Sequence, residues 1–348
     1  MDDRASLFAK LQKCAPSSGV LFFHDQVPLQ AGMPDYDEHT SRELILFNEK
    51  KLPSEGTEVL DGLPLTTAVV EEALLSSLEE LSCTTEHAAC AERATRGQAN
   101  CELWHQLRRG RITSSNFAKV LHRKASTAPE NLVKQLMGYS SATAVSHAIT
   151  WGKKHEDTAQ KMYIAEQRRK QHPGLTVKTS GLNIFSPVPF LAASTDGKVN
   201  DPTARPADGV LEIKCPYSID GVNVTDLSPT ELASRYPGKF CLSFADGEAS
   251  LDRKHAYFAQ VQDEMAVCNC SWCDFVVWTK GGLFVQRVML DRDYWESAYL
   301  LLERCFRSVL LPELVLRRVQ RGLRLDGSDI ASELLSVQKS AEEDLSSL

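Results

Sequence analysis

Two nearby stretches of the sequence decide the fold: Ser194-Thr195-Asp196-Gly197 and Gly209-Val210-Leu211-Glu212-Ile213-Lys214-Cys215-Pro216. The second stretch is apolar around two charged residues, Glu212 and Lys214. Alternate residues of a strand share one face, so these two side chains are predicted to point the same way. Ile213 is then buried on the opposite face.

Asp196 stands beside Gly197, where we expect a strand to end in a turn. Two carboxylates that converge on a sheet form a site of hard oxygen ligands suited to Mg²⁺ or Mn²⁺. An ammonium beside them can orient a water, help deprotonate it, or neutralise charge on a phosphate. Acid-x-Lys triplets usually face solvent, but the apolar run around Glu212 favours a buried site, where a metal ion offsets the charges.

Hydrophobic patterns on both sides of this segment predict alternating strands and helices. The fold class is therefore α/β, with a small mixed β-sheet flanked by helices. Strands are expected at 175–185, 190–193, 210–215, 273–279 and 283–290, and helices at 65–81, 142–169, 255–267 and 294–311.

The net charge of −7 averages over unlike parts of the chain. Residues 101–180 carry 14 Lys and Arg against 5 Asp and Glu, whereas residues 1–100 carry 8 against 17. The basic block is either a local phosphate-binding surface or an ordinary solvated face, and charge alone leaves both readings open.

Several classes of protein are disfavoured by composition. No apolar run approaches 18 residues, so we expect no membrane contact. The N-terminus begins Met1-Asp2-Asp3-Arg4 without an apolar stretch behind it, which argues against a secretory signal. Ten scattered cysteines fit a reducing compartment better than a disulfide framework. We therefore expect an intracellular protein, in either the nucleus or the cytoplasm.

Four motifs occur in series between residues 103 and 312. They are Trp104-His105-Gln106-Leu107-Arg108-Arg109-Gly110-Arg111-Ile112-Thr113-Ser114-Ser115, Trp151-Gly152-Lys153-Lys154-His155-Glu156, the pair of stretches quoted above, and Ala256-Tyr257-Phe258-Ala259-Gln260-Val261-Gln262. In this order they resemble the W-x-x-L-R-x-G-x-I-T-A-S, W-G-K-x-x-E, S-P-D-G…L-E-L-K-C-P and A-Y-M-A-Q-V-Q motifs of the YqaJ-type viral recombinase family. That family includes lambda exonuclease and belongs to the PD-(D/E)xK nuclease superfamily.

The resemblance implies a restriction-endonuclease-like core and a role for each matching residue. Asp196 and Glu212 would bind the metal, with the Ile213 carbonyl as a further ligand. Glu156 would support the same metal or a second one. Lys214 would act on the attacking water, and Gln260 would position Lys214 or that water.

The resemblance also implies residues that contact DNA. Arg108 and Ser115 would hold a terminal 5′-phosphate, and Ser115 has an independent argument, because free N–H groups at a helix start favour an anion. Arg111, Lys153 and Tyr257 are further predicted DNA contacts.

The function that follows is a Mg²⁺-dependent deoxyribonuclease, with Mn²⁺ as a substitute, acting as a 5′-to-3′ exonuclease on linear duplex DNA in recombination or repair. The alternatives are a structure-specific endonuclease of the same fold, a catalytically inactive DNA-binding module, or a regulatory protein. Expected partners are DNA, a further copy of the chain and a single-strand annealing recombinase. The predicted domains are an acidic extension with a helix at 1–100, the exonuclease-like domain at 101–318 and a polar tail at 319–348.

The chain departs from the family pattern in places. Thr195 replaces the proline of S-P-D-G, and Ser114 replaces the alanine of T-A-S. The loop at 200–206 is longer than a minimal hairpin. Cys268, Cys270 and Cys273 have ligand-like spacing, but no fourth Cys or His lies close by, so thiols without metal are favoured over a zinc site.

Overall fold

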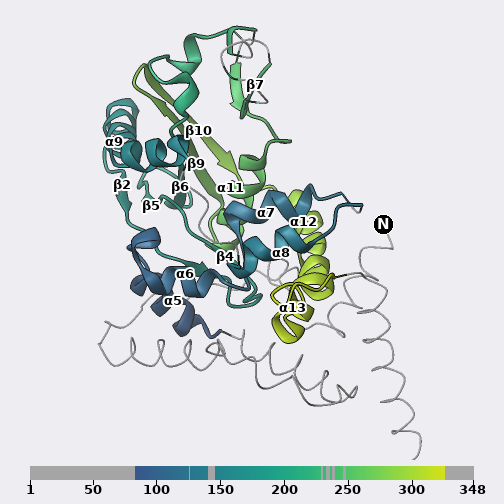
Figure 1. Cartoon of the computed structure of the whole chain (residues 1–348). Coiled ribbons are helices and arrows are strands. Elements are labelled where there is room, and N and C mark those ends of the chain that lie inside the picture. Colours follow the sequence, from purple (N-terminus) through teal and green to yellow (C-terminus); the bar gives the residue numbers. More distant parts are fainter. Residues whose placement is uncertain are drawn as a thin grey trace, which may run out of the picture.

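The fold is built around one mixed β-sheet with helices on both faces (Figure 1). The computed structural model describes residues 83–124, 126–139, 146–228, 230–232, 236, 240–245 and 248–325. The helix predicted at 65–81 lies outside these residues, as does the tail beyond 325. No helix among the described residues is long and apolar enough to cross a bilayer.

The main sheet has five strands in the order β10-β9-β6-β5-β2. Their bounds are β2 Thr176–Lys178, β5 Gly197–Asn200, β6 Asp208–Lys214, β9 Trp272–Thr279 and β10 Gly282–Met289. The β6–β9 pair is parallel and the other pairs are antiparallel, so the sheet is mixed. β6 lies at its centre and is buried on both faces, which explains why its sequence reads as an apolar run.

Two smaller sheets accompany the main one. One has the order β1-β4-β3, and the other is a hairpin of β7 and β8. The strands are β1 Ile112–Thr113, β3 Asn183–Ile184, β4 Leu191–Ala193, β7 Leu242–Ala245 and β8 Glu248–Leu251. The single strand predicted at 175–185 is wrong in one respect: it is divided into β2 and β3, which belong to different sheets. Between β2 and β3 the Gly181 N–H donates to the side chain of Glu92, a residue of the helix Thr85–Ala94, instead of to a neighbouring strand.

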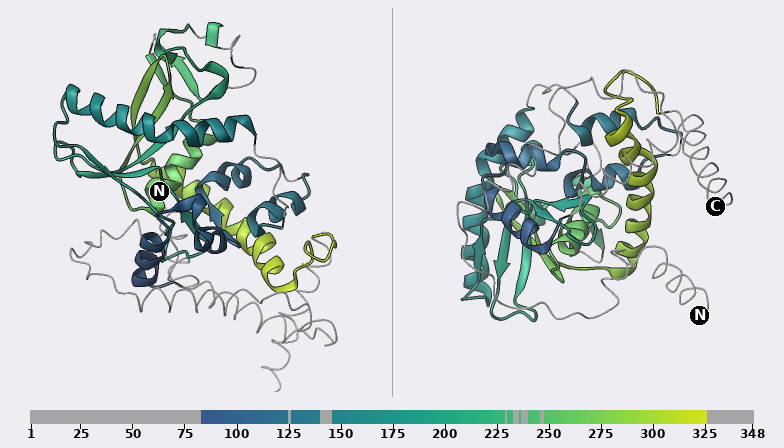
Figure 2. Two further views of the ribbon diagram at one scale, coloured as in Figure 1. Left: turned by 60° about the vertical axis from the view of Figure 1, so that its left-hand side comes forward. Right: turned by 90° about the horizontal axis from the view of Figure 1, so that it is seen from below.

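Helices cover both faces of the main sheet. Their bounds are α6 Glu102–Arg108, α7 Ser114–Leu121, α8 Glu130–Met137, α9 His147–Lys170, α11 Ala256–Val267, α12 Arg292–Cys305 and α13 Leu311–Leu316, with a π-helical turn, η4, at Phe306–Leu310. The long helix α9 crosses one face (Figure 2, left), where Ala159 and Tyr163 pack on Leu211 and Ile213. α11 packs on the other face, beside Val210. The prediction of a small mixed sheet flanked by helices is confirmed.

Residues 83–100, the described part of the chain before 101, pack on the strands of the same unit. Helix α5 (Thr85–Ala94) lies against β3. Thr95 Oγ1 accepts from the Leu182 N–H at 2.8 Å. Packing there is close, since a Cβ at Gly181 would lie 1.9 Å from the Glu92 carbonyl oxygen. At the other end Val319 and Leu325 are buried. We therefore propose domain boundaries outside residues 101 and 318.

Candidate active site

Asp196 is held against the central strand β6. Its N–H donates to the Leu211 carbonyl at 3.0 Å, and its carboxylate accepts from the Ile213 N–H at 2.6 Å. These two bonds bracket Glu212, so the first two predicted carboxylates are fixed side by side by backbone contacts. Asp196 comes just before β5, as the Asp-Gly turn signal predicted.

Glu212 and Lys214 lie on the face of β6 that α11 covers, whereas Ile213 packs under α9. The predicted alternation is therefore confirmed. Lys214 Nζ forms an ion pair with Glu212 Oε1 and donates to Gln260 Oε1 at 3.2 Å. Gln260 Nε2 in turn donates to Glu212 Oε1 at 2.6 Å. The three side chains form a closed hydrogen-bonded ring.

The charge state of Lys214 follows from its neighbours. Burial by itself would lower the pKa of Lys214, but Glu212, Tyr257 and Asp196 outweigh burial and raise that pKa. The ammonium also lies 4.3 Å from the centre of the Tyr257 ring. Lys214 is thus a fixed cation at neutral pH, and the Tyr257 ring, predicted to contact DNA, lies against this lysine.

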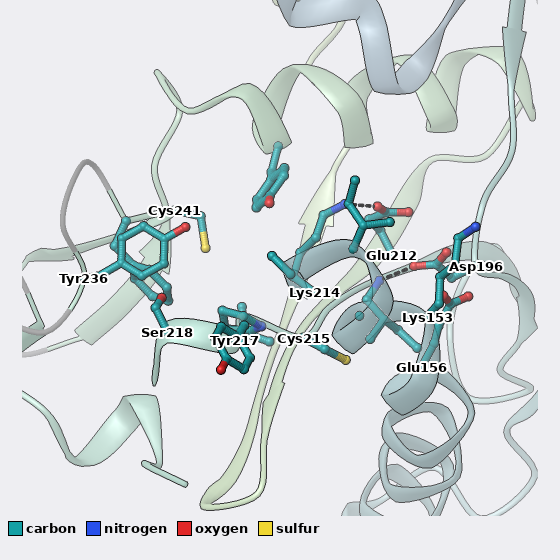
Figure 3. A pocket seen from close by; sticks show the side chains of 18 of the residues that line it. Lys153, Glu156, Asp196, Glu212, Lys214, Cys215, Tyr217, Ser218, Tyr236 and Cys241 are labelled. Atoms are coloured by element: carbon teal, nitrogen blue, oxygen red, sulfur yellow. Dashed lines mark hydrogen bonds and ion pairs between the residues drawn. The ribbon is translucent and has the colours of Figure 1, made fainter. Parts of the chain in front are cut away.

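Glu156 joins the site from helix α9. Figure 3 shows it next to Asp196, on the same side of the pocket as Lys153. Burial raises the pKa of Glu156, and the Glu212 carboxylate raises it further. Burial, Glu212 and Glu156 likewise hold the pKa of Asp196 well above its usual range. The raised pKa values show that the negative charges of these carboxylates repel one another. A bound cation would offset that repulsion.

The residues present fit a divalent metal ion of the Mg²⁺ class. Glu212 Oε2 is buried and has no hydrogen-bond partner, which is costly unless a cation meets it. The nearby donors are oxygens, as hard cations prefer. Lys214 and Gln260 occupy the other oxygen of Glu212. Within the described ranges no group of three or more His, Cys, Asp or Glu side chains is placed to hold a metal ion. Asp196 and Glu212 alone would therefore need further oxygen ligands, such as a main-chain carbonyl or water.

Glu264 is a member of the site that the sequence did not reveal. It lies one turn after Gln260 on α11, is fully buried, and accepts from Gln260 Nε2 at 2.9 Å. Burial, followed by the charge of Glu212, raises the pKa of Glu264 well above its usual range. α11 is buried on all sides, so it shows no amphipathic stripe that would have distinguished a site residue from a core residue.

Glu264→Gln is expected to lower kcat for DNA degradation about 10- to 100-fold with KM unchanged, because partners that orient site residues typically contribute that much. The raised folded-state pKa means that the carboxylate destabilises the fold above its ordinary value of 4.5. The variant should therefore melt higher than the parent at pH 8, with the difference shrinking as pH falls toward 4.5. Glu102→Gln, at an exposed position of α6, is the control and should change neither quantity.

The carboxylates and Lys214 line a pocket of about 450 Å³. Figure 3 shows Lys214 near its middle, the carboxylates on one side, and Tyr217, Tyr236 and Cys241 on the other. Lys153 and Tyr257, both predicted to contact DNA, also line it. Asp196, Glu212, Ile213, Lys214 and Glu156 all line the same pocket, so the structure brings together the core of the predicted site.

Arg108 and Ser115 form a separate pair that does not line the pocket. Arg108 donates to Ser115 Oγ at 3.0 Å, and its guanidinium lies 4.1 Å from the centre of the Trp104 ring. Trp104 Nε1 donates to Ser194 Oγ at 2.8 Å, which ties the pair to the strand end at Asp196. Burial lowers the pKa of Arg108 to about 10. An anion at this place would offset the cost of burying its charge.

Arg111, predicted to contact DNA, requires a correction. It is only 6% exposed, and it donates to the carbonyls of Pro189 at 2.9 Å and Leu107 at 2.7 Å. These bonds hold the end of α6, so the side chain is buried rather than at the surface where DNA would bind. His155, of the Trp151–Glu156 motif, is also covered: its ring stacks with Trp278, 5.1 Å between centres, and its Nε2 is buried.

The cysteines among the described residues are buried or half-buried thiols. Cys270 Sγ donates to the Cys268 carbonyl, and Cys273 lies fully buried in β9. Burial raises the pKa of Cys270 to about 11 and that of Cys215 to about 12, so both thiols stay protonated at neutral pH. These observations support packing roles over a zinc site or a nucleophile.

Comparisons with known proteins found one similar domain family and several similar solved structures. Residues 103–271 match the family model of the YqaJ-like viral recombinase domain. An alkaline exonuclease from Laribacter hongkongensis is 23% identical with a TM-score of 0.45, over 64% of this chain and 98% of that one. The shutoff and exonuclease protein of Kaposi's sarcoma-associated herpesvirus is 15% identical with a TM-score of 0.45, over 88% of this chain and 91% of that one. No curated protein matches the chain. The resemblance that the four motifs predicted is therefore confirmed: residues 103–271 are similar to the YqaJ-like viral recombinase domain.

Proposed function

We propose that the protein is a divalent-metal-dependent deoxyribonuclease, and specifically a 5′-to-3′ exonuclease that degrades linear duplex DNA during recombination or repair. The YqaJ-like domain supports the general part of this proposal, a nuclease that acts on DNA. The observation that carries it is the cluster of Asp196, Glu212 and Lys214 in one pocket, with a buried carboxylate oxygen of Glu212 left without a partner.

Each residue of the cluster has a part in phosphodiester hydrolysis. A bound Mg²⁺ would neutralise charge on the phosphate and activate a water. Asp196, Glu212 and the Ile213 carbonyl would hold the ion, with Glu156 beside them. Lys214, whose raised pKa keeps it protonated, would orient the water and neutralise charge on the phosphate rather than act as a base. Gln260, itself held by Glu264, would fix the lysine.

The end-directed part of the proposal rests on Arg108 and Ser115. Both lie in the basic block, and Ser115 lies in the first turn of α7, where backbone N–H groups are free for an anion. A terminal phosphate carries more charge than a phosphodiester, so it gains most from this pair. A homo-oligomer and a single-strand annealing recombinase stay proposed partners on the strength of the family alone.

The test is to incubate the purified full chain with 5′-labelled linear duplex and with closed circular duplex. With Mg²⁺ or Mn²⁺ we expect loss of the linear DNA alone, and with EDTA no loss. Ca²⁺ should support binding without efficient cleavage, because it is larger and less strict in geometry. Equal cleavage of closed circles would favour a structure-specific endonuclease. Binding without cleavage under all metals would favour an inactive DNA-binding module.

A further inference from the structure

A column of four rings runs from the core to the edge of the pocket. Trp278 of β9 is buried and stacks with His155, which lies 4.1 Å from Trp151, centre to centre. Trp151 meets Tyr217 edge to face, 5.5 Å between ring centres. The four residues come from α9, β9 and the 3-10 turn η2 (Tyr217–Ile219), so the column is a product of the tertiary fold.

Tyr217 is the exposed end of this column. It is 55% exposed, although it lines the pocket that contains the carboxylates. Trp151 is covered more fully, because Lys280 Nζ lies 4.5 Å from its ring centre and is held there by Asp220 at 2.9 Å. The Tyr217 ring is therefore the surface on which a further planar group can stack.

A glycine in the second turn of α9 also lines this pocket. Gly152 follows Trp151 and lines the pocket, and no atom of the described chain lies within 4 Å of where its Cβ would be. Glycine inside a helix is unfavourable relative to alanine. Packing within the protein does not explain this glycine, so the space beside it is available to a ligand.

We propose that Tyr217, backed by Trp151, is a stacking platform for one unpaired base of the DNA strand whose backbone reaches Asp196 and Glu212, with Gly152 leaving room for that strand. The proposal rests on the proposed nuclease function and adds the recognition of an unpaired nucleotide. Every base offers a flat π face, so such a platform reads no sequence. Lys153, which is exposed and lines the pocket on the side of the carboxylates (Figure 3), supplies charge for the backbone.

The occupant is a base rather than another planar group because of what shares the pocket. Tyr217 stands at the opposite side from the carboxylates, with Lys214 between them (Figure 3). A pocket of about 450 Å³ has the size of a small-molecule site, which suits one or two nucleotides of a single strand better than base-paired DNA. The strand that enters would therefore be locally unpaired, and its bases need a new stacking partner.

The test uses 2-aminopurine, whose fluorescence falls when it stacks, placed at each of the first positions from the 5′ end of an otherwise thymidine oligonucleotide. Binding is measured in EDTA, so that no turnover interferes. The parent should quench the probe at one or two positions. Tyr217→Leu should abolish that quenching and weaken binding roughly 5- to 150-fold, the range for loss of one stacked base. Tyr217→Phe keeps the ring and should behave like the parent.

Gly152→Ala is the second variant. It should raise the melting temperature slightly, because alanine favours the helix, yet weaken binding of the same oligonucleotide several-fold. Since this variant is expected to be more stable than the parent, its loss of binding cannot be ascribed to unfolding. Leu300→Ala, at an exposed apolar position of α12 outside the pocket, should match the parent in all measurements.

Quenching that survives in Tyr217→Leu, or that is lost equally in Tyr217→Phe, would overturn the platform, as would a parent that quenches at no position. The nuclease proposal is judged separately, by degradation of linear duplex with Mg²⁺ by the same preparations. A parent that degrades DNA while Tyr217→Leu binds normally contradicts the platform alone. A parent that degrades no DNA contradicts the nuclease.

Discussion

Asp196→Asn is expected to reduce degradation of linear duplex DNA by roughly a thousandfold at saturating Mg²⁺, because the charge neutralisation that a metal ion supplies to phosphodiester hydrolysis contributes several kcal/mol. The asparagine keeps an oxygen that can accept from the Ile213 N–H, so the geometry of the strand end should be preserved. DNA binding in Ca²⁺ should fall far less than turnover. The measurement is single-turnover cleavage across a Mg²⁺ titration.

The same variant should be more stable than the parent when no metal is present. Burial, Glu212 and Glu156 raise the folded-state pKa of Asp196 above the ordinary value of 3.8. The folded protein then binds this proton more tightly than the unfolded chain does, so the ionised carboxylate destabilises the fold as pH rises above 3.8. Melting temperatures in EDTA at pH 8 should therefore be higher for Asp196→Asn, and the difference should disappear toward pH 4.

Asp208→Asn provides the matched control, because Asp208 lies on the same strand pair but is exposed and bonds only to Asn200 among the contacts described here. It should change neither cleavage nor melting by an appreciable amount. Full turnover by Asp196→Asn, or a large fall in its melting temperature in EDTA, would contradict the assignment of Asp196 to the metal site.

Arg108→Ala is expected to remove most of the preference for a 5′-phosphorylated end over a 5′-hydroxyl end. Loss of a charge-assisted contact with a phosphate costs about 1.5–3 kcal/mol, or roughly ten- to a hundredfold in relative rate. The parent should degrade the phosphorylated linear duplex faster by at least that factor. The comparison uses both duplexes, parent and variant, at two salt concentrations.

Arg109→Ala is the control for Arg108, since it removes the same charge from an exposed neighbouring position. It should leave the end preference intact. Lys153→Ala and Lys154→Ala should weaken binding of both duplexes alike and more strongly at low salt, as backbone contacts do. A parent without any preference for the phosphorylated end would contradict the exonuclease proposal but leave the nuclease proposal standing.

Local patterns in the sequence were enough to predict that the motif residues lie close together in space. Period-2 alternation in a buried strand put Glu212 and Lys214 on one face, and the Asp-Gly turn put Asp196 at a neighbouring strand end. Such local rules act over a few residues, so a single sequence displays them. The same holds for Ser115, whose place in the first turn of α7 follows from the polar run before an apolar helix.

Other features of the site could not be predicted from the sequence, because they depend on the environment of a side chain rather than on its type. Arg111 sits in a basic motif, yet it bonds to two backbone carbonyls, and nothing local distinguishes an arginine that meets DNA from one that caps a helix end. Glu264 lies on a helix buried on every side, where apolar periodicity is absent. The division of the strand predicted at 175–185 likewise came from contacts with α5, about 90 residues earlier in the chain.

The sequence by itself determined the fold class, the resemblance to the YqaJ-type family and the residues that carry the candidate chemistry, because these follow from short-range patterns of polarity and from motif order. Only the tertiary structure decided which basic residues are buried, that Glu264 holds Gln260, and that Trp278, His155, Trp151 and Tyr217 form one column ending at the pocket. These features join segments that are far apart in the chain. Their energies come from burial and contact between such segments, which no local pattern records.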